Sequence, residues 1–177
     1  ETKTHHFERI CFLLLVGRYP TQEESDTFNA YMAEHRELPE PVINVIKTIP
    51  SKNIMNKLQT CISTLYAFDD SPDELDPTES FLKSVRIIAK LGSIVAYSYL
   101  VAFKKNPTLA IPDKKMSHAE SFLHMLYEGK KPGTFESYIV DLALVLHAEH
   151  GGGNNSTFTT YVVTSSGSDI YSSLAAA

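Results

Sequence analysis

The sequence is poor in the features that mark several common classes of protein. It has two cysteines, Cys11 and Cys61, each within an apolar run and without another cysteine or a histidine at metal-ligand spacing. Buried free thiols are therefore favoured over a disulfide, which indicates a reducing compartment and predicts a cytoplasmic location. No stretch approaches the roughly 20 apolar residues that span a bilayer, and the first residues do not resemble a secretory signal.

An excess of positive charge is missing as well. The 177 residues include 16 Lys and Arg against 21 Asp and Glu, which gives a formal net charge of −5. This balance offers no overall electrostatic reason to bind nucleic acid or an anionic membrane. An anionic ligand would have to be held by a few well-placed donors. The length suits a single domain with a substantial core.

Motifs of several enzyme classes are also absent. The sequence contains no Ser-His-Asp order, Gly-x-Ser-x-Gly elbow, Cys-x-x-Cys pair or phosphate-binding loop. The acidic segment 69–77 lacks the regular alternation and the glycine of a calcium loop, so a solvated connector is favoured over a metal site. We therefore expect no metal and no resident cofactor.

Helical periodicity dominates what is present, and capping signals support it. Apolar residues recur at three-to-four spacing, and Thr21 with Glu24 forms the pattern of a capping box, as does Ser117 with Glu120. Ser51 is expected to cap the helix that follows Pro50. We expect helices over residues 7–17, 21–38, 42–49, 51–66, 78–105, 117–128 and 135–150, then from 154–156 and after 169.

Two of these expected helices have an unusual composition. The threonine-rich segment 157–164 has strand propensity, but a helix is favoured because no other segment could pair with a strand there. The helix 78–105 is apolar around most of its circumference, which is typical of a helix buried in a core or at a subunit interface. The predicted fold class is all-α.

One dense polar cluster occurs, at residues 147–156, which read His-Ala-Glu-His-Gly-Gly-Gly-Asn-Asn-Ser. His147 and His150 are three residues apart at the end of an apolar helix, so they are expected to point the same way. A histidine at the C-terminal end of a helix is biased toward the charged form. Glycines allow a ligand to approach the backbone closely, and the first N–H groups of the next helix can donate to a carboxylate. The pattern predicts a site that grips a small dicarboxylate.

Plainer interpretations of the cluster stay open. A histidine on an apolar face is more often a core or rim residue, and three glycines often only end a helix. Zinc could use His147 and His150, but the third ligand would have to be Glu149, which faces elsewhere. Four other histidines are expected at the surface: His5, His6, His118 and His124.

The same residues resemble a known family. The run from Leu146 to Thr159 is similar to the citrate synthase pattern, in which a helix ends in His-Ala-Asp/Glu-His before a short loop and Asn-x-Ser-Thr. Segments 7–21, 87–91 and 165–171 also resemble family elements, and the likeness extends over essentially the whole chain. It implies the multi-helical large domain of a bacterial citrate or 2-methylcitrate synthase.

The resemblance implies an acyltransferase of the tricarboxylic acid cycle, which joins acetyl-CoA to oxaloacetate and hydrolyses citryl-CoA. His150 would hydrogen-bond oxaloacetate, with His147 and Asn154 beside it, and Ser156 would orient the catalytic histidine that acts on the thioester. Acetyl-CoA is a co-substrate, and no cofactor is implied. The alternatives are a 2-methylcitrate synthase that uses propionyl-CoA and a non-catalytic helical interaction module.

The resemblance also implies what residues 1–177 do not hold. The family's Gly-Pro-x-His-Gly-Gly segment, its second catalytic histidine, its aspartate and its substrate-binding arginines have no counterpart here, and neither has its Tyr-Arg-Gly segment. Asn53-Ile54-Met55 replaces a common His-Pro-Met. We therefore expect residues 1–177 to be part of the large domain, truncated at both ends, with the small domain absent and no activity alone. The parent is expected to be a homodimer that pairs through helix 78–105.

Overall fold

The structure is a computed structural model that describes residues 6–177, and all regular structure within these residues is helical. The all-α fold class is therefore confirmed, including a helix over the threonine-rich segment. The helices are α1 (His6–Val16), α2 (Gln22–Glu34), α3 (Glu40–Thr48), α4 (Ile54–Leu65), η1 (Tyr66–Phe68), α5 (Pro77–Phe103), α6 (His118–Leu126), α7 (Thr134–Leu146), α8 (Asn155–Thr164) and α9 (Ile170–Ala176).

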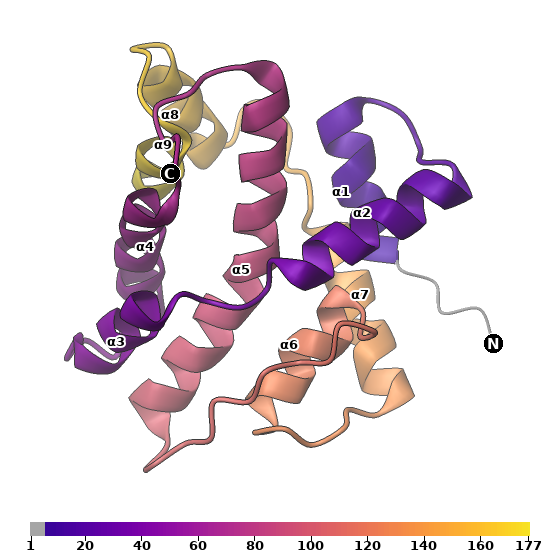
Figure 1. Cartoon of the computed structure of the whole chain (residues 1–177), viewed down its shortest axis with the longest axis vertical. Helices are drawn as coiled ribbons and strands as arrows, with labels where there is room; N and C mark the ends of the chain where they lie inside the picture. The colour runs from indigo at the N-terminus through magenta and orange to yellow at the C-terminus, as the bar shows by residue number, and fades with distance from the viewer. Residues whose placement is uncertain (1–5) are drawn as a thin grey trace.

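Helix α5 runs through the middle of the molecule and separates two groups of helices (Figure 1). Helices α3, α4, α8 and α9 lie on one side, and α1, α2, α6 and α7 lie on the other. Direct packing of α5 on α2, α3, α4 and α6 joins the two groups. The candidate site lies on the connection from α7 to α8, which passes from one group to the other.

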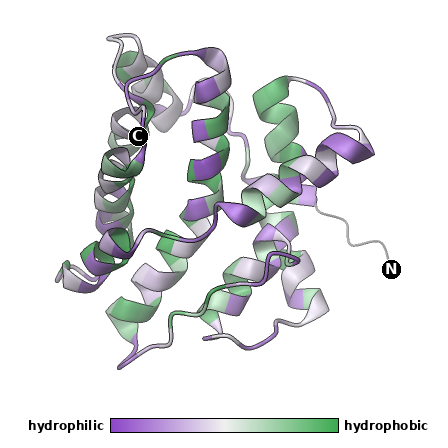
Figure 2. Cartoon of the chain, in the orientation of Figure 1, coloured by the Kyte–Doolittle hydropathy of each residue, from purple (hydrophilic) through white to green (hydrophobic). Residues whose placement is uncertain are grey.

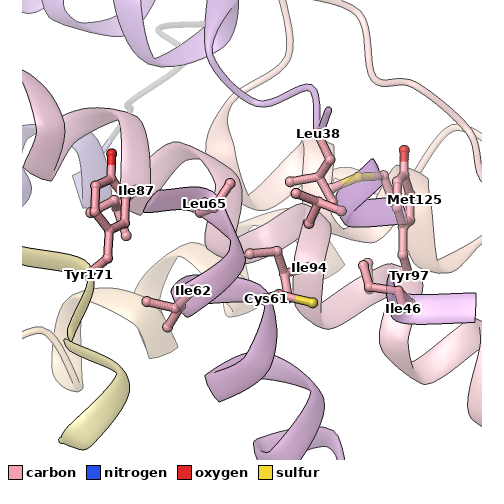
Figure 3. Packing of buried hydrophobic residues seen from close by; sticks show 12 residues of the cluster. Leu38, Ile46, Cys61, Ile62, Leu65, Ile87, Ile94, Tyr97, Met125 and Tyr171 are labelled. Atoms are coloured by element: carbon pink, nitrogen blue, oxygen red, sulfur yellow. The ribbon is translucent and has the colours of Figure 1, made fainter. Parts of the chain in front are cut away.

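The core has two parts, one in each group. Figure 3 shows the larger one, where residues of α3, α4, α5 and α6 pack together with Tyr171 of α9. The smaller part is formed by α1, α2 and α5. Cys61 lies in the larger part and Cys11 in the smaller, and both are free thiols, as predicted. Burial is the main cause that raises the pKa of Cys11 to about 12 and that of Cys61 to about 11, so both stay protonated.

Two predicted capping boxes are present, at Thr21 with Glu24 and at Ser117 with Glu120. The predicted cap at Ser51 is wrong. Asn53 caps α4, because its side-chain oxygen accepts from the backbone N–H groups of the first turn, while Ser51 accepts from the Asn53 N–H at 3.0 Å. This start also leaves Met55 exposed, because the buried face of α4 is set by Cys61, Ile62 and Leu65.

Helix α5 corrects the expectation that no stretch is long and apolar enough to cross a membrane. It meets that requirement by length and composition, but half of its most apolar stretch is buried inside the protein. Its surroundings are the other helices of the chain. The helix therefore has the burial of a core helix, and Asp76 caps its first turn.

His118 corrects a second expectation, because it is buried rather than at the surface. It is the first residue of α6, and its backbone N–H donates to Glu8 Oε1 of α1 at 2.7 Å. Arg36 lies in the same region and donates to Ser121 Oγ at 2.6 Å. Burial is the largest cause that lowers the pKa of His118 to about 4, so its imidazole is neutral at pH 7. His5 lies outside the described residues.

Candidate functional site

Helix α7 carries the first half of the candidate site, and it is attached to α1 and α6. The attachment to α1 is specific. The buried carboxylate of Asp141 accepts the backbone N–H of Phe7 at 3.1 Å, and its other oxygen lies 3.1 Å from His6 Nδ1. Burial is the first cause that raises the pKa of this carboxyl. Asp141 thus holds the N-terminal end of α1 against α7.

The predicted placement of both histidines on one helical face is wrong. Helix α7 ends at Leu146, so His147 is its C-cap residue and His150 lies beyond the helix. The ring of His147 turns back toward the helix, and its Nδ1 lies 2.8 Å from the carbonyl oxygen of Ala143. A carbonyl only accepts, so Nδ1 carries a proton and Nε2 remains available to a ligand. Both imidazoles are exposed to solvent.

The glycine run provides an open loop. Gly151 has a φ of +77°, which disfavours any other residue, whereas nothing lies within 4 Å of the place that a Cβ would take at Gly152 or Gly153. The Gly151 N–H donates to Glu149 Oε1 at 2.6 Å, so this carboxylate folds back onto the loop. Within residues 6–177, no group of three or more His, Cys, Asp and Glu side chains is arranged to hold a metal ion.

Asn154 and Ser156 form the second half, at the start of α8. The side-chain oxygen of Asn154 accepts from the N–H groups of Ser156 at 2.8 Å and Thr157 at 3.2 Å. From the sequence, these backbone N–H groups were expected to bind a carboxylate of the ligand. In the structure they donate to the Asn154 side chain instead. The side-chain amide nitrogen of Asn154 stays available as a donor. The Ser156 hydroxyl donates to an oxygen of Ala177, the last residue of the sequence, at 2.8 Å, and its lone pairs can still accept.

The junction 147–156 brings exposed polar side chains together on one short stretch. His150 and Asn154 place donors along one exposed stretch, and Ser156 offers an acceptor beside them. The free Nε2 of His147 accepts when the ring is neutral and donates when the ring carries both protons. Within residues 6–177, neither of these two imidazoles forms a hydrogen bond or an ion pair with a carboxylate. The junction 147–156 thus combines exposed nitrogen and oxygen groups without a carboxylate paired to either imidazole.

A cavity of about 730 Å³ elsewhere is a poorer candidate for a dicarboxylate. It lies between the α2–α3 connection and the acidic segment that follows η1, and it contains Arg86 and Lys90 of α5. Burial lowers the pKa of Lys90 to about 8, and its ammonium donates to the carbonyl oxygen of His35. Six carboxylates surround these two cations, so an added anion would be repelled: Glu34, Glu37, Glu40, Asp69, Asp70 and Glu79.

The sequence pattern singled out four residues of the junction as candidates, but not the side chains that position them. Asp141 gave a signal, because it is a lone carboxylate within the apolar run of α7. The hydroxyl contact between Ser156 and Ala177 gave none, because 21 residues separate the partners. Such contacts depend on how α8 and α9 pack, which local patterns do not specify.

Comparisons with known proteins agree over nearly the whole chain. The family model described as "Citrate synthase, C-terminal domain" matches residues 2–177. Citrate synthase of Haloferax volcanii is 37% identical over 176 residues, which are 97% of this chain and 45% of the relative. Citrate/2-methylcitrate synthase of Bacillus subtilis is 31% identical over 177 residues, covering 99% of this chain and 46% of the relative.

A solved structure shows the same fold. Citrate synthase from Pyrobaculum aerophilum superposes with a TM-score of 0.86 at 30% sequence identity, over 96% of this chain and 44% of that structure's chain. The chain therefore spans less than half the length of these relatives.

Proposed function

The chain belongs to the citrate synthase family, and from this premise we propose that the complete protein joins acetyl-CoA to oxaloacetate and releases citrate and CoA. The observation that carries the proposal is the junction 147–156, where two exposed histidines and Asn154 lie on one short stretch between α7 and α8. A family of acyl transfer enzymes needs such a place to hold the acceptor acid while the thioester approaches.

The roles follow from the donors and acceptors that each side chain keeps free. His150 donates to oxaloacetate, and His147, whose Nε2 is unoccupied, and Asn154 support the same ligand. Charged imidazoles form stronger hydrogen bonds to carboxylates than neutral ones. Ser156 accepts an imidazole N–H and so orients the histidine that acts on the thioester. No resident cofactor or metal enters this scheme, and the acyl-CoA is a co-substrate.

Residues 1–177 are proposed to lack activity by themselves. The support is that the junction offers binding groups without a partnered general base, and that the chain spans less than half of its relatives. Citrate formation by a protein of these 177 residues from acetyl-CoA and oxaloacetate would overturn this point.

The choice of acyl-CoA separates the leading proposal from its closest alternative. The relatives include a protein named citrate/2-methylcitrate synthase, so propionyl-CoA is the competing substrate. The complete protein should be assayed with both thioesters under identical conditions. A higher kcat/KM for acetyl-CoA supports citrate synthesis, and a higher value for propionyl-CoA supports 2-methylcitrate synthesis. Absence of both products would leave the helical interaction module as the better description.

The parent is proposed to be a homodimer in the cytoplasm. Helix α5 was predicted to carry the contact, but its large exposed apolar side chains are limited to Tyr99 and Phe103. Helix α7 offers more, because a continuous exposed stripe follows its length: Phe135, Tyr138, Ile139, Leu142 and Leu146. The exposed C-terminal end of α1 is also hydrophobic (Figure 2). These surfaces support pairing through α7, and the two free thiols support a reducing compartment.

A further inference from the structure

His150 is the donor of the candidate site that the helices support least. It lies beyond the end of α7, and its side chain is exposed. Within residues 6–177, its imidazole forms no hydrogen bond or ion pair. His147 and Asn154 are each placed by a helix end, because they are the C-cap of α7 and the N-cap of α8. The direction of the His150 ring therefore depends on the backbone of the loop that carries it.

This loop has an unusually wide choice of backbone conformations. The three residues that follow His150 are glycines, which are the least restricted of all residues. Gly151 uses this freedom, with a φ of +77°. No atom of the described residues lies within 4 Å of the place that a Cβ would take at Gly152 or Gly153. Packing therefore does not hold the loop, and a specific contact is needed to fix it.

Glu149 provides such a contact. Its Oε1 accepts the backbone N–H of Gly151 at 2.6 Å, so the side chain of one neighbour of His150 is tied to the backbone of the other. The contact closes a small ring of atoms that contains the backbone N, Cα and C of His150. Hydrogen bonds to a carboxylate are shorter and stronger than those between neutral groups. The Glu149 contact therefore limits the φ and ψ angles that His150 can adopt.

Gly151 is also tied in the other direction, toward the start of α8. Its carbonyl oxygen accepts the backbone N–H of Asn154 at 3.3 Å, and the Asn154 side chain caps α8. Gly151 is thus shared by the Glu149 contact and by the turn that leads to Asn154. Both contacts are made within residues 149–154, so they do not depend on how distant helices pack.

We propose that Glu149 is a positioning residue that holds His150 toward oxaloacetate by joining the residues on its two sides. The proposal rests on the proposed function, which assigns His150 as a donor to this acid. Glu149 acts through its acceptor oxygen and does not bind the substrate, because its negative charge repels a dicarboxylate. A loop that adopts its binding conformation for only part of the time weakens the apparent affinity by that fraction. Glu149 therefore lowers the KM for oxaloacetate.

Two substitutions of Glu149 in the complete protein separate its acceptor oxygen from its charge. Glu149→Ala removes both, whereas Glu149→Gln keeps an acceptor oxygen. We expect Glu149→Ala to raise the KM for oxaloacetate about fivefold, the effect of losing one hydrogen bond, and to change kcat less than about twofold. The KM of Glu149→Gln should equal that of the wild type or lie below it, because the acceptor remains and the repulsive charge is gone. Steady-state kinetics measure both constants.

Glu136→Ala is the matched control. Glu136 is also exposed, and its Oε2 also accepts a glycine N–H, that of Gly133 at 3.1 Å. This contact lies at the start of α7, at the opposite end from His150. The KM and kcat of Glu136→Ala should equal those of the wild type. Circular dichroism and thermal unfolding establish that each variant is folded.

A double-mutant cycle tests whether Glu149 acts through His150. In the His150→Ala background, Glu149→Ala should raise the KM for oxaloacetate by less than about twofold, because the group that it positions is gone. Full and independent effects of the two substitutions would overturn the positioning role. A Glu149→Gln variant as weak as Glu149→Ala would also overturn it, as would an equal loss in Glu136→Ala.

The same measurements distinguish this inference from the proposed function. A wild-type protein that forms neither citrate nor 2-methylcitrate would overturn both together. Turnover by the wild type, with a KM for oxaloacetate that Glu149→Ala leaves unchanged, would overturn this inference alone.

Discussion

At the scale of single residues, buried polar side chains connect helices to one another through hydrogen bonds. His118 is neutral because burial outweighs the attraction of the nearby Glu8 carboxylate, and Arg36 adds to the shift in its pKa. Lys57 is buried as well, and its ammonium donates to the carbonyl oxygens of Ile46 and Ile49 at the end of α3. Each of these groups ties elements together that apolar packing alone would leave free to slide.

His118 makes the stability of the fold depend on pH. Its pKa is about 4 in the folded chain against an ordinary value of 6.5, so the unfolded chain binds the proton more strongly between these values. Stability is therefore full above pH 6.5 and is lost as pH falls toward 4, by on the order of 3 kcal/mol. The thermal midpoint of the wild type should fall further between pH 7 and pH 5 than that of His118→Gln. Equal changes in the two proteins would contradict the assignment.

At the scale of helices, the sequence predicted where most elements lie but not every end. Capping boxes located the starts of α2 and α6, because their hydrogen bonds are local. Ser51 and Asn53 are both good capping residues, and only the packing of α4 decides between them. The end of α7 was placed at residue 150 instead of Leu146, because nothing in the apolar pattern shows that the His147 ring returns to Ala143.

The joint between α7 and α1 gives a test at this scale. Asp141→Ala leaves the Phe7 N–H without its acceptor and releases His6, so α7 should move relative to the rest of the site. We expect the KM for oxaloacetate to rise about fivefold or more, with a smaller change in kcat, because both histidines follow directly on the end of α7. Steady-state kinetics of the complete protein measure both values. Asp26→Ala, at an exposed position of α2, is the control. If Asp141→Ala lowered kcat alone and left KM unchanged, the proposed role of Asp141 in oxaloacetate binding would be wrong.

At the scale of the whole molecule, composition and periodicity predicted an all-α fold and located the junction 147–156. They did not predict that α7 would keep an apolar stripe on its outer face. That fact depends on which faces the other helices cover: α1 and α6 pack on one side of α7, while residues such as Phe135 stay exposed. The contacts of Tyr171 with Asp69 were equally hidden, since they join residues 102 positions apart.

The proposed pairing of two copies through the exposed stripe on α7 can be tested in the complete protein. Ile139→Asp puts a charge in the middle of the stripe, where burial against a second copy would be costly. We expect sedimentation equilibrium to show a dimer for the wild type and a largely monomeric protein for this variant. Ile111→Asp is the matched control, because Ile111 is exposed but lies outside every helix. Dimers in both variants would place the contact elsewhere.

The proposed function depends most on His150 as a ligand of oxaloacetate, and the affinity of the complete protein for this acid tests that role directly. Isothermal titration of oxaloacetate into the wild type, His150→Ala and the control His124→Ala separates binding from catalysis. We predict that His150→Ala weakens binding about tenfold or more, the loss of one charge-assisted hydrogen bond, while His124→Ala binds like the wild type. Unchanged affinity in a folded His150→Ala protein would contradict the assignment of the junction 147–156 as the binding site.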